Sequence, residues 1–186
     1  MGSRCIPHSA GVGVQLCSLD VIHAYTHSLL AVLLNPIYGA YENPKLWLCE
    51  GEVVADDHGL KVGVKTLTTI EEMPLPVVTT KQHVKFAILC AKQVCRDEKW
   101  NVWADMWLSG EDRSHATAAQ IAQTAKAPMW WAAQVAADVA TTPFNRVTAV
   151  REVAKVAARA AWWAMVSGTG FLPLNLTALA EQAIQI

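Results

Sequence analysis

Apolar side chains recur densely from residue 19 to residue 34, and this run ends at Asn35-Pro36. Ser18 or Asp20, at the start of the run, can cap a helix. The pattern therefore predicts a mostly buried helix over this stretch. Residues 1–18 carry proline and glycine without periodicity, which predicts irregular structure.

Two apolar and β-branched runs follow, at residues 46–54 and 61–70, and the second alternates apolar and polar positions. Runs of this kind predict β-strands. The segment between them, Asp56-Asp57-His58-Gly59, carries residues that tolerate the positive φ angles of tight turns. We therefore expect an antiparallel hairpin with a positive φ at Gly59, ended by Pro74, which cannot donate to a strand ladder.

Helical periodicity begins near Thr80 and continues through Trp100, Trp103 and Trp107, which are spaced three and four residues apart. It predicts one helix that ends at Ser109-Gly110, with the three tryptophans on a single face. We interpret this tryptophan face as the seam between the front and back parts of the chain.

The back part is rich in alanine, which makes up 18 of the 53 residues from 114 to 166. Alanine has the highest helix propensity, so this segment is expected to be helical. Pro128 and Pro143 divide it into three helices, and Gly168 ends the third. A fourth, short helix is predicted from about Asn175 to the end of the sequence.

The third of these helices places small and basic side chains on different faces. Its alanines form one stripe (Ala154, Ala157, Ala158 and Ala161), and its basic residues lie on another face (Arg151, Lys155 and Arg159). Two tryptophan doublets, Trp130-Trp131 and Trp162-Trp163, supply volume that alanine lacks. Only 8 of the last 73 residues are charged, so we expect these four tryptophans to form an interaction face, against the front part or a second copy in a homodimer.

These patterns predict an α+β fold. Residues 1–80 form a small domain with a β-hairpin or small antiparallel sheet. Residues 81–186 form an antiparallel helical bundle, with a linking helix at 81–110 and Ala/Trp-rich helices at 114–186.

Composition narrows the function classes. A formal net charge of -1 gives no basic surface for general nucleic-acid binding. The five cysteines lack disulfide spacing, which favours a reducing compartment, and we expect a cytoplasmic location. Residues 160–180 carry no charge over a length that can span a bilayer, but Gly168, Gly170 and Pro173 interrupt them, so no membrane span is expected.

The strongest local candidate for chemistry is His23-Ala24-Tyr25-Thr26-His27, in which two imidazoles share one helix face at a spacing that can bind a metal. A glutamate does not follow His23, and no third ligand lies nearby in the sequence. We therefore expect no metal, and one partly buried histidine beside one that caps a helix or lies at the surface. His23, Tyr25 and His27 are our candidate ligand-binding residues, with no cofactor.

Other reactive residues do not define a catalytic site in the sequence. Cys90 and Cys95 diverge on a helix and are expected to pack in the core. Glu50 and Glu52 share a strand face, which suits acid and base chemistry but is more typical of a solvated strand. A phosphate-binding glycine loop is missing.

Three motifs resemble a family of uncharacterised bacteriophage and prophage proteins: Leu19 to Ala24, Leu46 to Val54 with its Glu-Gly-Glu-Val-Val sequence, and Lys61-Val62-Gly63-Val64-Lys65. Members of the family look like a short domain with a His-Ala step and a lysine-bearing strand, followed by a tail rich in Ala, Trp and Arg. The resemblance covers most of residues 19–166. It implies a phage origin and an accessory role inside an infected bacterium.

We therefore expect a non-enzymatic accessory protein of counter-defence type that binds a host protein or a small host signalling molecule. Two alternatives stay open. One is a nucleotide-handling enzyme of the ADP-ribosyltransferase type, whose first-position and catalytic-glutamate motifs are not visible in this sequence. The other is a structural or assembly protein of the phage particle.

Overall fold

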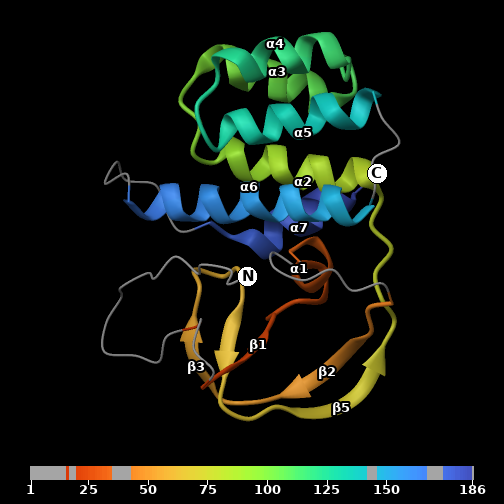
Figure 1. The fold of residues 1–186 in the computed structure, drawn as a ribbon, viewed down its shortest axis with the longest axis vertical. Helices are drawn as coiled ribbons and strands as arrows, with labels where there is room; N and C mark the ends of the chain where they lie inside the picture. The colour runs from red at the N-terminus through yellow and green to blue at the C-terminus, as the bar shows by residue number, and fades with distance from the viewer. Residues whose placement is uncertain (1–15, 17–19, 35–42, 142–145, 167–173, 186) are drawn as a thin grey trace, which may run out of the picture.

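The computed structural model describes residues 16, 20–34, 43–141, 146–166 and 174–185. In chain order, the elements are β1 (Ile22–Ala24), α1 (Ser28–Leu33), β2 (Leu46–Glu50), β3 (Val53–Asp56), β4 (Val62–Val64), β5 (Thr68–Met73), α2 (Thr80–Lys92), α3 (Glu98–Ser109), α4 (His115–Thr124), α5 (Met129–Thr141), α6 (Arg146–Val166) and α7 (Leu176–Ile184). Figure 1 shows the strands gathered at one end of the molecule and the longer helices stacked in layers above them. The fold is α+β, as the sequence predicts. The predicted irregular structure of residues 1–18 lies, apart from Leu16, outside the described residues.

The strands form one long, bent hairpin with a third strand added. β3 pairs with β4, and β1 joins the other side of β4, both antiparallel. β2 precedes β3 and pairs with β5, which follows β4. The predicted hairpin is thus confirmed, although each predicted strand is broken in two, at Gly51-Glu52 and at residues 65–67. In the turn, φ is 80° at Gly59 and 52° at His58, and β5 ends directly before Pro74.

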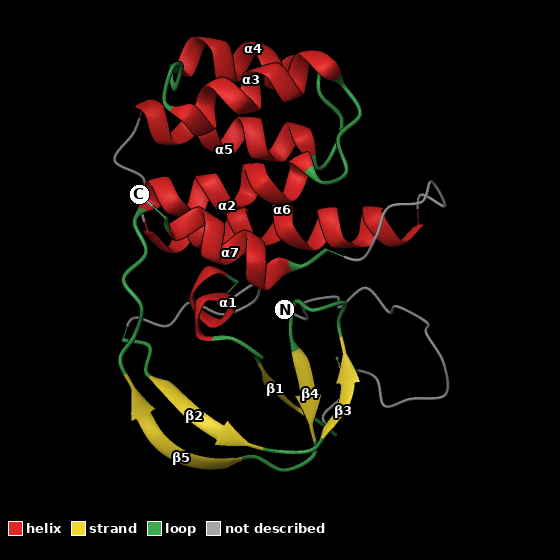
Figure 2. Cartoon of the chain, turned by 180° about the vertical axis from the view of Figure 1, so that it is seen from behind, coloured by secondary structure: helices red, strands yellow, loops and turns green. Residues whose placement is uncertain are grey.

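The break at Gly51 depends on the absence of a side chain. A β-carbon there would lie 2.5 Å from the carbonyl oxygen of Thr66 and 3.3 Å from the β-carbon of Val64. A backbone oxygen of the opposite segment can move only if that segment of the chain moves with it, so the two segments approach this closely only at glycine. Beyond this point the β2–β5 ribbon curves away from the three-stranded sheet, as Figure 2 shows.

The helix predicted over residues 19–34 is wrong in its first part. Ile22–Ala24 is β1, which pairs with Val62–Val64, and only Ser28–Leu33 is helical. Pairing with an available strand edge outweighs the local helical pattern, because strand preference depends on cross-strand neighbours more than on the sequence itself. The leucines of α1 are still buried, against α6 and α7, so the predicted burial is correct although the helix is shorter.

α2 is the central helix of the bundle. A capping box fixes its start: the Thr79 hydroxyl accepts from the Gln82 N–H (3.2 Å), and Gln82 Oε1 accepts from the Thr79 N–H (2.8 Å). From His83 to Ala91 all but one of its residues are buried, because α3, α5, α6 and α7 pack around it.

The single helix predicted for residues 80–110 is two helices. The chain leaves α2 after Lys92, and Asp97 caps α3 by accepting from the Trp100 N–H (3.2 Å). The three stripe tryptophans of α3 are buried, as one face requires, but α3 lies at the end of the bundle away from the sheets (Figure 1). Trp100 Nε1 donates to the carbonyl of Met129 in α5 (3.2 Å). The stripe therefore packs against the Ala/Trp-rich helices of the back part, as its interpretation as a seam requires on that side, while the strands lie at the other end of the molecule.

The alanine-rich segment forms α4, α5 and α6 as predicted, and α7 is the fourth helix. Pro128 directly precedes α5, whereas Pro143 and Gly168 lie outside the described residues. The Asn175 side chain caps α7 by accepting from the Ala178 N–H (3.0 Å). The described helices include none that is long and apolar enough to cross a membrane.

Alanine stripes are buried between α2, α5 and α6, including Ala132, Ala133, Ala136 and Ala137 on α5 and Ala154, Ala157, Ala160 and Ala161 on α6. Small side chains at these positions bring the helix axes close together. On another face of α6, Lys155 Nζ and the Arg159 guanidinium lie 5.7 and 5.2 Å from the centre of the Trp131 ring. Part of the basic face noted in the sequence therefore covers a tryptophan by cation–π contact.

At the seam between the front part and the bundle, α1 packs against α6 and α7. α7 packs against both α1 and α2. Gln82 Nε2 donates to the Ile184 carbonyl and Lys85 Nζ to the Gln185 carbonyl, each over 3.0 Å. The last helix of the chain thus holds the small front helix against the central helix of the bundle.

Candidate functional site

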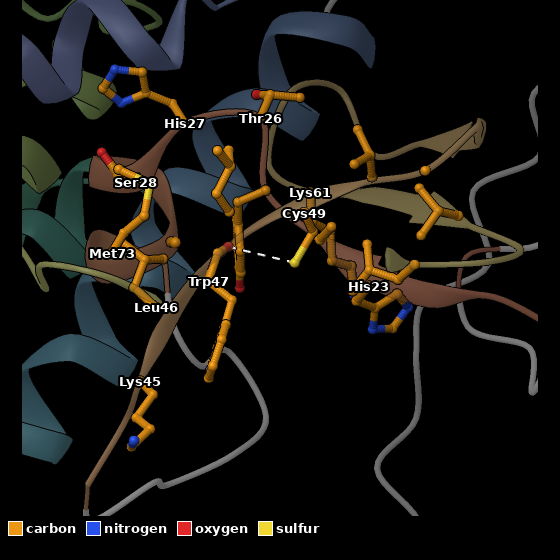
Figure 3. Close-up of a pocket in the computed structure, with 18 of the residues that line it drawn as sticks. His23, Thr26, His27, Ser28, Lys45, Leu46, Trp47, Cys49, Lys61 and Met73 are labelled. Carbon is orange, nitrogen blue, oxygen red and sulfur yellow. Dashed lines mark hydrogen bonds between the residues drawn. The ribbon is translucent and has the colours of Figure 1, made fainter. Parts of the chain in front are cut away.

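A groove of about 800 Å³ opens beside the bent hairpin. The β2–β5 ribbon forms one wall, β1 and β4 contribute the other, and the first turn of α1 closes the end that faces the helices. Figure 3 shows the lining side chains. The volume falls within the range of roughly 300–1,000 Å³ that is usual for small-molecule sites.

Apolar and aromatic side chains make up much of the ribbon wall, among them Leu46, Trp47, Met73 and Leu75. Trp47 keeps 44% of its surface exposed, which is unusual for so large an apolar residue. Cys49 follows on the same strand, and its thiol donates to the Trp47 carbonyl over 3.6 Å (Figure 3). The ribbon thus offers an exposed flat ring at the groove.

His23, Tyr25 and His27, the three candidate ligand-binding residues, all line this groove. The prediction that the two histidines share one helix face is wrong, because His23 lies in β1 and His27 is the N-cap of α1. His27 Nδ1 accepts from the Leu29 N–H (3.3 Å), and its Nε2 lies 3.9 Å from Glu181 Oε1 on α7. The interpretation of one histidine as a helix cap is therefore confirmed.

The other two candidates also make hydrogen bonds to the backbone. His23 Nε2 hydrogen-bonds to the Leu16 carbonyl, and the Tyr25 hydroxyl donates to the Leu34 carbonyl over 3.5 Å. The two imidazoles are thus held by separate partners on different elements. Within the described ranges, no three His, Cys, Asp or Glu side chains cluster in a way that could hold a metal ion.

Lys61 is the groove residue that the sequence analysis missed. It directly precedes β4, the central strand of the three-stranded sheet, and is only 8% exposed, which is rare for lysine. Burial lowers the pKa of its ammonium group, and the negative charge of Asp57 partly offsets that effect. The available sequence signal was a lysine flanked by Leu60 and Val62 in an alternating strand.

The charged residues of the groove lining have one sign. Lys45 and Lys61 are lysines, His23 and His27 are the other basic residues, and the lining that the structure describes includes no Asp or Glu. Lys45 lies at the rim, 64% exposed, and its Nζ is 2.9 Å from Glu72 Oε2. Lys61 is therefore the cation that is both buried and part of the groove wall.

The other reactive residues of the sequence lie apart from the groove or at the surface. Cys90 and Cys95 are buried free thiols, as expected, and burial raises the pKa of both, which makes them poor nucleophiles. Glu50 and Glu52 are exposed, in agreement with a solvated strand face. Cys5 and Cys17 lie outside the described residues.

The tryptophan doublets are placed differently from each other. Trp131 packs on the core under α6, within the back part of the chain, whereas Trp130 is 36% exposed. Trp162 and Trp163 are 40% and 38% exposed near the end of α6, where Met165 and Val166 are exposed too. The predicted interaction face therefore remains a prediction for Trp130 and for the second doublet.

We expect a combined Trp162→Ala and Trp163→Ala variant to separate two copies of the chain if this face forms a homodimer, because each copy would present the same apolar patch. Sedimentation equilibrium should then give a dimer for the wild type and a folded monomer for the variant. A wild-type monomer at high protein concentration would remove the homodimer prediction.

Comparisons with protein-family models, with curated proteins and with solved structures found no match to this chain. The groove and the residues around it are therefore the basis on which its function is argued.

Proposed function

We propose that this protein is a non-catalytic binding protein whose groove takes a small molecule. The observation that carries the proposal is the groove beside the bent hairpin, with its aromatic wall at Trp47 and Tyr25 and the polar groups of Thr26, Ser28 and Lys61. Small-molecule sites typically combine a largely apolar lining with a few polar groups that orient the ligand.

The resemblance to phage proteins supports the proposed origin and cellular location of this protein. We propose an accessory protein of phage origin, active in the cytoplasm of the infected bacterium, that counters a host defence by binding a small host signalling molecule. A host protein is the other partner that fits an accessory role. The groove favours the small molecule, because a concave site built from several elements can enclose a compact ligand on more than one side.

Binding without catalysis is supported by the state of the groove histidines. His27 caps α1, and His23 holds a backbone carbonyl, so both rings have structural partners. The ADP-ribosyltransferase alternative gains no specific observation, and neither does particle assembly. Release of nicotinamide from NAD by the purified protein would contradict the non-catalytic proposal.

Binding can be tested with N-phenyl-1-naphthylamine, a neutral, flat, apolar molecule that fluoresces when it leaves water. We expect saturable binding of one molecule per chain. Trp47→Ala should weaken it by about tenfold, which corresponds to the loss of about 1.4 kcal/mol of aromatic contact.

Trp162→Ala is the matched control, because it removes an equally exposed tryptophan far along the chain from the groove. Its affinity for the probe should stay within about twofold of the wild type, since each twofold is only about 0.4 kcal/mol. If the wild type does not bind the probe, or if both variants weaken binding equally, the groove is not the site.

A further inference from the structure

The groove runs along one edge of β2. Every residue from 44 to 49 lines it, and Figure 3 shows Leu46, Trp47 and Cys49 of this series. Successive side chains of a strand point to opposite faces, so a groove over one face is lined by alternate residues. A groove that is lined by every residue of a strand lies instead beside the edge of that strand, where the backbone itself can be reached.

The other two strand groups line the groove in a different way. The three-stranded sheet contributes Val53, Val62 and Val64, which its pairing register places on one face. From β5, the partner of β2, only Met73 belongs to the lining that the structure describes. The groove is thus bounded by an apolar face of one sheet and by the edge of a strand of the other.

The edge of β2 beside the groove carries backbone groups without a strand partner. Among the described residues, β2 pairs with β5 on one side, and no strand adjoins its other side. The N–H and C=O groups along an unpaired edge form a template for one more strand. β2 has five residues, and at about 3.3 Å per residue its edge spans roughly 17 Å, so an extended chain of about the same length can pair with it.

We propose that the ligand of the groove is a short linear peptide, which lies along β2 as an added strand and exchanges backbone hydrogen bonds with its unpaired edge. This inference rests on the proposed binding function and names the class of the small molecule. The first turn of α1 closes one end of the groove, so the peptide must end there. A free peptide therefore fits the groove better than an internal segment of a folded protein.

The physical reason is complementarity of hydrogen-bonding groups. An extended peptide presents N–H and C=O groups at the same spacing as the strand that it joins, so the donors and acceptors of the β2 edge meet their complements. The valines of the three-stranded sheet offer apolar contacts to the side chains on one face of the peptide. A flat molecule such as N-phenyl-1-naphthylamine gains apolar contacts in the groove but leaves the backbone groups of β2 to water.

A matched pair of probes separates backbone pairing from filling of the groove: the peptide acetyl-Thr-Val-Thr-Val-Thr-amide and its ester analogue, in which oxygen replaces the N–H of each linking amide. Valine and threonine favour the extended conformation. The peptide should displace N-phenyl-1-naphthylamine from the wild type, as the fluorescence of the naphthylamine reports. The ester analogue should bind at least about tenfold more weakly, the scale of one lost hydrogen bond.

Trp47→Ala tests whether the preference for the peptide over its ester comes from the backbone. Loss of the ring should weaken the binding of both molecules, but their ratio of affinities should stay within about twofold of the wild-type ratio, since that change is only about 0.4 kcal/mol. Trp162→Ala is the control, with both affinities unchanged. A preference that disappears in Trp47→Ala would assign it to the ring and overturn the inference.

Amide hydrogen exchange, followed residue by residue by NMR, locates the contact. The amides of β2 that exchange rapidly in the free protein are those on the unpaired edge, and bound peptide should slow their exchange at least about tenfold, as one new hydrogen bond per amide implies. The naphthylamine should not slow them.

β5 is the control within the same ribbon. In the described ranges its outer edge also lacks a neighbouring strand, but the exposed Glu71 and Glu72 disfavour strand addition there. Exchange on that edge should stay the same when the peptide binds. Slowing of β5 amides without slowing of β2 amides would overturn the inference.

Extended peptides distinguish a free peptide from an internal segment of a longer chain. Four added residues, Gly-Ser-Gly-Ser, should be tolerated at one end of the peptide. At the end that meets α1 they should weaken binding at least about tenfold, the cost of a steric clash. If both extended peptides bind like the short one, a free peptide is not the ligand class that the groove selects.

The remaining outcomes separate the peptide inference from the proposed function. If neither the naphthylamine nor the peptide binds, the binding function itself is overturned. If the naphthylamine binds but the peptide does not, or if the peptide and its ester bind with equal affinity, the binding function stands and the peptide inference is overturned.

Discussion

Replacing Trp100 with alanine is expected to lower the free energy of unfolding by about 3–5 kcal/mol, the usual cost of removing a large buried aromatic side chain. Trp100 is 1% exposed, packs edge-on against Trp103 with ring centres 5.5 Å apart, and donates to the Met129 carbonyl. The substitution leaves a cavity between α3 and α5 and removes the indole hydrogen bond to the Met129 carbonyl. Denaturant unfolding followed by circular dichroism measures the change.

Trp162→Ala is the control, because its ring is 40% exposed on α6. The expected loss is about 1 kcal/mol or less, as for most substitutions away from the core. The loss of unfolding free energy for Trp100→Phe should lie between those of the two alanine variants, since phenylalanine keeps a ring but lacks the indole donor. Equal losses for Trp100→Ala and Trp162→Ala would contradict the assignment of the stripe as core.

This contrast shows what the sequence could predict about the bundle. The helical segments from residue 115 to 184 follow from alanine content and proline positions, and the structure has four helices there. It was harder to predict which large side chains fill the core of the bundle, because periodicity shows which residues share a face but not which face is covered by another element. The tryptophan doublets are large enough to fill this core, yet most of its large buried side chains come from α2 and from the tryptophan stripe of α3.

The front part shows a similar division. The turn at residues 56–59 specifies its own conformation, so the hairpin and the positive φ of Gly59 follow from local chemistry. β1 does not, because its pairing with β4 is a tertiary event between segments about forty residues apart. The local pattern of residues 19–34 therefore predicts a longer helix than the six-residue α1.

The groove was only partly predictable for the same reason. His23, Tyr25 and His27 were chosen as a helical cluster, and they reach one groove from a strand, a link and a helix cap. Trp47 comes from β2 and Lys61 directly precedes β4, and both join these residues only after the hairpin bends. No spacing in the sequence encodes that juxtaposition.

The bend itself leads to the second large effect: Gly51→Ala is expected to lower the free energy of unfolding by about 1–3 kcal/mol, the usual cost of overpacking. The new methyl group would lie 2.5 Å from the Thr66 carbonyl oxygen, so the two strands must separate at the junction of β2 with β3. For a chain of this size the melting temperature should fall by roughly 2–4 °C per kcal/mol. Thermal unfolding by calorimetry measures it.

Gly59→Asn is the matched control in the same hairpin. Asparagine tolerates the φ of 80° at that position, and a β-carbon there would lie 3.9 Å from Leu176 Cδ1, an ordinary contact. Its melting temperature should stay within a few degrees of the wild type. Because Gly51 lines the groove, separation of the strands should also weaken binding of the neutral naphthylamine probe, whereas Gly59→Asn should not. A Gly51→Ala protein that melts and binds like the wild type would show that the close approach of the two strands does not set the shape of the groove.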